Sequence, residues 1–121
     1  MRILMIEDNE SNAYLARFLL ERAGHVVELA RTGVAGVAAA RCGGFDAILL
    51  DLRLPDGNGC DFVADLRAAD SRRVPVIAVS AHAMAADQQR ARDVGCEAFI
   101  EKPIQVASFV ASIEQIAAQP R

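Results

Sequence analysis

Five short apolar runs recur along the chain, each about one strand long and each followed by a stretch with helical spacing. The runs cover residues 3–6, 26–29, 47–50, 76–79 and 98–100. Strands that alternate with helices are typical of βαβ units, whose right-handed crossovers cover both faces of a parallel sheet. The pattern therefore predicts an α/β fold, a doubly wound (βα)5 arrangement with a five-stranded parallel sheet.

The apolar character of each run predicts its place in the sheet. Runs 3–6, 47–50 and 76–79 are purely apolar and fit central strands that are buried on both faces. Glu28 interrupts the run 26–29, which therefore fits an edge. The expected strand order is 2-1-3-4-5, as in flavodoxin-like sheets. With 121 residues, the chain has the length of a single domain, which we expect to span residues 1–121.

Apolar residues at helical spacing predict the helices, together with glycines that end them. The residues with this spacing are Leu15, Phe18 and Leu19; Val34, Val37 and Ala38; Phe62, Val63 and Leu66; and Val106, Phe109, Val110, Ile113 and Ile116. The helix expected at about 84–94 is different, since only Met84 and Val94 are available as large apolar anchors. The Pro- and Gly-rich stretch 54–59 is expected to be a loop.

Composition excludes several classes of protein. Hydrophobic residues make up 53% of the chain, too many for a disordered protein. The net charge of −3 offers no electrostatic footprint for nucleic acid. The apolar runs are too short to span a membrane, and no secretory signal is visible. The three cysteines are odd in number and widely spaced, so we expect reduced thiols in a cytoplasmic protein.

Charged or hydroxyl residues follow four of the apolar runs. Glu7 and Asp8 follow the first run, Asp51 the third and Ser80 the fourth, and Lys102 comes shortly after the last. Lys102 is the only lysine in the chain, against twelve arginines. Because the carboxyl ends of parallel strands meet at one edge of a sheet, these side chains are expected to converge in the crevice where open α/β sheets bind ligands.

These residue types suit phosphoryl transfer. Clustered carboxylates repel one another unless a cation or proton intervenes, and oxygen ligands favour Mg²⁺, or alternatively Mn²⁺, over zinc. An aspartate can act as a nucleophile and form an aspartyl phosphate, and Asp51 stands alone at the end of a central strand. Lys102 can supply a mobile positive charge, and Ser80 a hydroxyl donor, to the phosphoryl oxygens.

The sequence resembles the response-regulator receiver domain. The resemblance covers the whole chain and is carried by Glu7-Asp8, Asp51 with Leu54-Pro55-Asp56-Gly57, Ser80-Ala81 and Lys102-Pro103. It implies that Asp51 accepts a phosphoryl group from a histidine of a sensor kinase or a histidine phosphotransfer protein. It also implies Mg²⁺ bound by Asp8, Asp51 and the backbone carbonyl of Arg53, with Glu7 assisting, and a cis peptide bond before Pro103.

The resemblance further implies a switch. Ser80 is expected to move towards the phosphoryl group, and Phe99 matches the aromatic residue that turns inward when the hydroxyl moves. The face made by the fourth helix, fifth strand and fifth helix would then bind a downstream protein. Arg53 and His82 stand where receivers tune hydrolysis. Such a chain is a signalling module that supports only its own phosphorylation and dephosphorylation, with no nucleic-acid partner and no membrane insertion.

Several alternatives remain open at this stage. Residues 83–84 and 95–100 look like stand-alone cell-cycle receivers of the DivK type, yet a receiver excised from a hybrid kinase or a longer regulator would look much the same. A flavin-binding flavodoxin-like protein would need a phosphate loop where Glu7 and Asp8 stand. A hydrolase of the haloacid dehalogenase type would separate its first two acidic residues by one position.

Overall fold

The five apolar runs form one parallel sheet in the computed structural model, which describes residues 1–70, 72–81 and 84–119. The strands are β1 (Arg2–Ile6), β2 (Val26–Ala30), β3 (Ala47–Asp51), β6 (Val76–Ser80) and β7 (Ala98–Glu101). Their order is β2-β1-β3-β6-β7, with every neighbouring pair parallel. This confirms the predicted flavodoxin-like order, including the edge position of β2.

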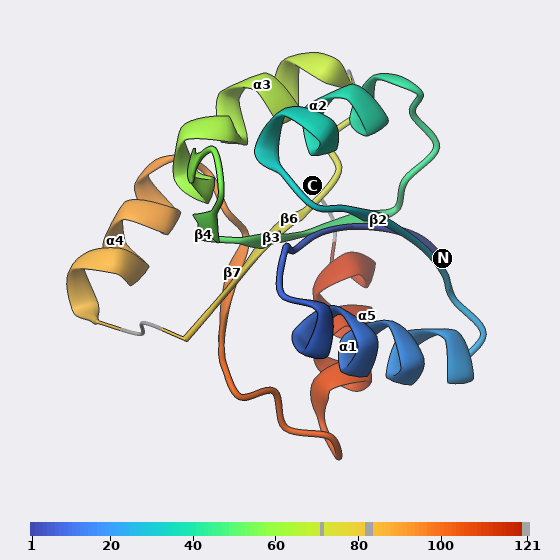
Figure 1. Cartoon of the computed structure of the whole chain (residues 1–121). Coiled ribbons are helices and arrows are strands. Elements are labelled where there is room, and N and C mark those ends of the chain that lie inside the picture. The colour runs from blue at the N-terminus through green and yellow to red at the C-terminus, as the bar shows by residue number, and fades with distance from the viewer. Residues whose placement is uncertain (71, 82–83, 120–121) are drawn as a thin grey trace.

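Helices cover both faces of the sheet, as a doubly wound fold requires. They are α1 (Glu10–Arg22), α2 (Gly33–Arg41), α3 (Val63–Ala69), α4 (Ala85–Asp93) and α5 (Phe109–Ala118), with a 3₁₀ turn at Gly59–Phe62 before α3. Figure 1 shows α1 and α5 together on one face and α2 and α3 on the other. Asn9 caps α1 by accepting a hydrogen bond from the backbone N–H of Asn12 at 3.0 Å.

Alternating strand residues divide the interior into two cores. On one side, Leu4, Ile6, Ile48 and Leu50 pack with Val37, Val63, Leu66 and Ala91 of α2, α3 and α4. On the other side, Ile3, Met5, Ala47 and Leu49 pack with Ala13, Ala16, Leu20, Phe109 and Ile113 of α1 and α5. Every residue of β3 and β6 is buried, which fixes the ends of these two strands firmly.

The buried faces of the helices differ in part from the sequence prediction. Most buried residues of α1 and α2 are small, with Leu20 and the predicted Val37 as the large ones. Phe18 is 48% exposed and Val34 66% exposed. A Cβ atom at Gly36 would overlap the side chain of Ile6, which shows how closely α2 approaches β1. Val106 lies before the start of α5 and is exposed rather than part of its apolar face.

The stretch expected to be a loop after Asp51 folds back on itself. Strands β4 (Arg53–Leu54) and β5 (Gly57–Asn58), of two residues each, form an antiparallel hairpin. Gly57 follows the turn and has a positive φ of 142°, which favours glycine. A Cβ atom at Gly59 would overlap the backbone carbonyl of Asp51, so glycine is required there. The segment after Asp51 is therefore compact and lies directly against that residue.

The three cysteines are free thiols, as expected. Cys42 is exposed, while Cys60 and Cys96 are buried. Burial raises the pKa of both buried thiols, that of Cys96 to about 12, so they behave as small apolar residues. Among the helices of the described residues, none has the length and apolar character that a membrane span requires.

Candidate functional site

Two parallel strands bring the acidic residues together at the carboxyl edge of the sheet. Ile6 pairs with Leu50, so Glu7 and Asp51, the residues that follow these two, lie side by side. Both are buried, at 5% and 6% exposure, whereas Asp8 is exposed. One carboxylate oxygen from each of the three residues lies within 4.8 Å of the others. The convergence expected from the strand ends is thus present in the structure.

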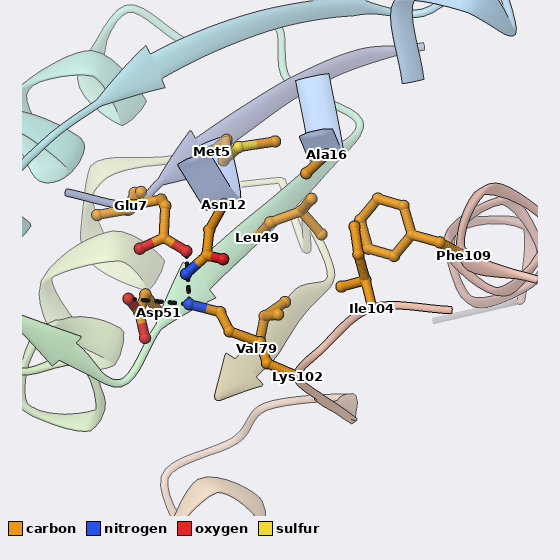
Figure 2. Close-up of a pocket in the computed structure, with 11 residues that line it drawn as sticks. Met5, Glu7, Asn12, Ala16, Leu49, Asp51, Val79, Lys102, Ile104 and Phe109 are labelled. Atoms are coloured by element: carbon orange, nitrogen blue, oxygen red, sulfur yellow. Dashed lines mark hydrogen bonds and ion pairs between the residues drawn. The ribbon is translucent and has the colours of Figure 1, made fainter. Parts of the chain in front are cut away.

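Lys102 completes this cluster from the segment after β7. Its Nζ lies 2.5 Å from Oε1 of Glu7 and 3.3 Å from Oδ2 of Asp51, and its side chain is 12% exposed. Figure 2 shows the ammonium group between the two carboxylates. The backbone N–H of Lys102 donates to the carbonyl of Ser80 at 2.9 Å, which ties it to the end of β6. The Lys102–Pro103 peptide bond is cis, the geometry expected for it.

The charges of the cluster do not balance. Burial raises the pKa of Glu7 from 4.5 to about 7, and the hydrogen bond with Asp51 adds to this increase, although Lys102 opposes it. Three carboxyl groups converge on a single ammonium group, so the cluster carries more acidic groups than Lys102 can neutralise. A bound cation would supply the missing positive charge.

The donor atoms fit Mg²⁺ or Mn²⁺. All three candidate ligands of the acidic cluster are carboxylates, the oxygen ligands that hard divalent cations prefer. The backbone N–H of Arg53 donates to Oδ1 of Asp51 at 3.1 Å, so the main chain of Arg53 lies beside that carboxylate. The role of its carbonyl as a ligand remains a prediction.

The proposed switch residues lie on the two neighbouring strands. Ser80 ends β6 and is 2% exposed. Phe99 of β7 is partly buried and packs against the core on the α2 and α3 side of the sheet. Ala78 pairs with Phe99, so the two switch candidates come from adjacent strands. Movement of either side chain remains a prediction, and His82 lies outside the described residues.

A small cavity of about 30 Å³ adjoins the cluster between α1 and α5. Its apolar wall consists of Met5, Ile6, Ala16, Leu49, Val79, Ile104 and Phe109, and its polar wall of Glu7, Asn12, Asp51 and Lys102. Asn12, which points towards this cluster in Figure 2, was not among the residues selected from the sequence. Its position four residues after Asp8, in the first turn of α1, is the signal that could have identified it.

A family model confirms the resemblance that the sequence motifs indicated. The model described as the response regulator receiver domain matches residues 3–114. Among curated proteins, the polar-differentiation response regulator DivK of Brucella anthropi is 41% identical over 113 residues, which cover 93% of this chain and 92% of the relative. DivK of Brucella ovis is 40% identical over the same length.

Solved structures have the same fold. The non-phosphorylated HemR receiver domain from Leptospira biflexa matches with a TM-score of 0.88 and 32% identity, covering 99% of this chain and 96% of that one. The receiver domain of the sensor histidine kinase PA1611 from Pseudomonas aeruginosa matches with a TM-score of 0.88 and 31% identity, covering 98% of both chains. That crystal structure has a magnesium ion coordinated in the active site cleft.

Proposed function

This chain belongs to the response regulator receiver domain family, and from that premise we propose that Asp51 accepts a phosphoryl group from a phosphohistidine. The donor is a sensor histidine kinase or a histidine phosphotransfer protein. The observation that carries this proposal is the position of Asp51, a nearly buried carboxylate at the end of a central strand, 3.3 Å from the ammonium group of Lys102.

The acidic cluster is the proposed metal site. Glu7, Asp8, Asp51 and the backbone carbonyl of Arg53 would hold Mg²⁺, with Mn²⁺ as a substitute. The metal contributes positive charge that offsets the charge of the phosphoryl oxygens. A cation held there would favour the ionised form of Glu7, whose pKa burial raises to about 7.

The chemical step needs no separate general base. One carboxylate oxygen of Asp51 attacks phosphorus, an O–P bond forms, and the N–P bond of the donor breaks with its electron pair left on the imidazole nitrogen. Lys102 and Ser80 bind oxygens of the transferred group. Because Lys102 comes from the segment after β7 and Ser80 from β6, the phosphoryl group contacts residues from two further strand ends.

We propose that these contacts operate a switch. Ser80 moves towards the phosphoryl group, Phe99 turns inward, and the face made by α4, β7 and α5 changes its affinity for a downstream protein. The weak packing of α4 and the similarity to DivK support this role. The chain would then act in the cytoplasm as a single receiver domain over residues 1–121, a signalling module and not an enzyme for other substrates.

The experiment is phosphorylation by acetyl phosphate in the presence of Mg²⁺, measured by intact mass. The wild-type protein should gain the mass of one phosphoryl group, and Asp51→Asn should gain none. Asp65→Asn, on the exposed side of α3, is the matched control and should be labelled like the wild type. Equal labelling of Asp51→Asn and the wild type would overturn the assignment of the acceptor.

A further inference from the structure

Asp56 lies at the tip of the β4–β5 hairpin and binds the N-terminus of α2. Its Oδ1 accepts a hydrogen bond from the backbone N–H of Gly33, and its Oδ2 accepts one from that of Val34, both at 2.9 Å. These hydrogen bonds lower the pKa of the Asp56 carboxyl group, so it is ionised at neutral pH. An anion is well placed here, because the first N–H groups of a helix lack partners within the helix.

A local cap already serves this helix end. The side chain of Thr32 accepts the N–H of Ala35 at 3.0 Å, which is the usual N-cap contact. Asp56 accepts hydrogen bonds from two earlier N–H groups of the helix, those of Gly33 and Val34, which are 23 and 22 residues away in sequence. Its contact is therefore a link between two separate segments as well as a cap.

Helix α2 is a firm support for such a link. A Cβ atom at Gly33 would overlap the ring of Phe62, and one at Gly36 would overlap the side chain of Ile6. Ile6 directly precedes Glu7 in the acidic cluster. A helix packed this closely on both sides cannot shift without disturbing its neighbours.

The opposite end of the hairpin is held beside Asp51, the proposed phosphoryl acceptor. The N–H of Gly59 donates to the carbonyl of Leu52 at 3.0 Å, and the N–H of Arg53 donates to Oδ1 of Asp51 at 3.1 Å. Each strand of the hairpin has two residues, and a hairpin of this size has little stability of its own. Its geometry beside Asp51 therefore depends both on these contacts at its base and on the contact that holds its tip.

We propose that Asp56 is a positioning residue for the metal site. Its carboxylate holds the hairpin tip on α2 and thereby keeps the backbone of Arg53 in place beside Asp51. The inference rests on the proposed function, since it concerns the Mg²⁺ ligands named there. Without this contact, the carbonyl of Arg53 would sample positions in which it cannot bind the cation.

The test is Mg²⁺ binding to the full chain by isothermal titration calorimetry, with no phosphodonor present. Asp56→Ala should bind Mg²⁺ about tenfold more weakly than the wild type, the lower end of the effect of residues that orient metal ligands. Asp56→Asn should fall between the two, because it keeps one acceptor oxygen and replaces the other with an NH2 group, which cannot accept an N–H. The control Asp65→Asn should bind like the wild type.

A second measurement separates positioning from a purely structural role. With acetyl phosphate as donor, Asp56→Ala should need about tenfold more Mg²⁺ for half-maximal phosphorylation, yet reach the wild-type rate at saturating Mg²⁺. General damage to the fold would instead lower the rate at saturation. If far-UV circular dichroism shows that Asp56→Ala is partly unfolded, Asp56→Asn decides the question.

The possible failures are distinct. Equal Mg²⁺ affinity in the wild type and Asp56→Ala, with faster amide exchange at Gly33 and Val34, would show that Asp56 only caps α2 and would overturn the inference alone. Absence of Mg²⁺ binding by the wild type would overturn the proposed function, and the positioning role with it.

Discussion

Two regions flank the acidic cluster, and the structure holds them in opposite ways. The segment after Asp51 is fixed by the hairpin contacts and continues into α3, which buries Val63 and Leu66 almost completely. Helix α4 has only Ala91 buried among its described residues, and its salt bridge from Arg90 to Asp61 joins two exposed side chains. The side of Asp51 is therefore closely packed and the α4 side loosely packed, which is the arrangement that the proposed switch requires.

The ends of α4 differ from the expectation based on the sequence. Met84 and Val94 were expected to anchor the fourth helix, but they flank α4 and are 70% and 37% exposed. The helix is held less firmly than its apolar residues indicated. Because few buried contacts mean a small free-energy cost of local opening, this exposure agrees with the proposal that α4 shifts, which stays a prediction.

Packing provides the largest expected difference between the two sides. Leu66→Ala should lower the free energy of unfolding by about 2–5 kcal/mol, because it leaves a cavity under α3. Met84→Ala beside α4 should change it by less than about 0.5 kcal/mol, as is usual for exposed side chains. Urea denaturation followed by circular dichroism measures both. Similar losses of unfolding free energy in the two variants would contradict the difference in packing between the two regions.

The carboxylates between the two regions predict a pH dependence. In the unfolded chain Glu7 titrates near pH 4.5, whereas in the folded protein its pKa is about 7. Between these values the folded state binds more protons, so the unfolding free energy of the protein in EDTA should fall as pH rises from 4.5 to 7 and then level off. The fall is about 3 kcal/mol at most, at 1.36 kcal/mol per pKa unit.

Urea denaturation across this pH range measures the effect. Glu7→Gln should remove most of the fall, because glutamine does not titrate. Glu10→Gln, at a residue whose side chain is 85% exposed, is the matched control and should behave like the wild type. A pH profile of Glu7→Gln that matches the wild type would show that another group causes the dependence.

Amide exchange tests the unequal mobility of the two regions most directly, although the expected effect is the smallest of the three. With Mg²⁺ and beryllium fluoride as a mimic of the phosphoryl group, exchange in α4 should change several-fold, and exchange in α3 by less than about twofold. Hydrogen–deuterium exchange with mass spectrometry resolves the two helices, and Asp51→Asn should show neither change. Equal changes in α3 and α4 would argue against a switch on the α4 side alone.

The sequence predicted the sheet and the convergence of Glu7, Asp51 and Lys102 because both follow from short-range patterns. A buried strand appears in the sequence as an apolar run, and the carboxyl ends of parallel strands lie at one edge of the sheet. Asp56 could not be assigned in this way. Its contact with Gly33 depends on where α2 settles in three dimensions, and no spacing in the sequence encodes that distance.

Which residues of α1 and α2 face the sheet could also not be predicted correctly from the apolar spacing. Apolar periodicity selects large residues, but close packing against the sheet favours small ones, so Ala16 and Gly36 face inward while Phe18 and Val34 face solvent. The hairpin after Asp51 was missed for a similar reason. Proline and glycine signal a turn, but not that Gly59 must lie against the backbone of Asp51.

The position of Lys102 has a practical consequence for chemical labelling. As the only lysine of the chain, it carries the only side-chain amine, and the α-amino group of Met1 is the other amine that an acylating reagent can modify. Its side chain is 12% exposed and its ammonium group is held by two carboxylates, so it should react slowly while the ion pairs persist. Modification of Lys102, located by peptide mass spectrometry, would therefore report when the ammonium group is released from its carboxylate partners.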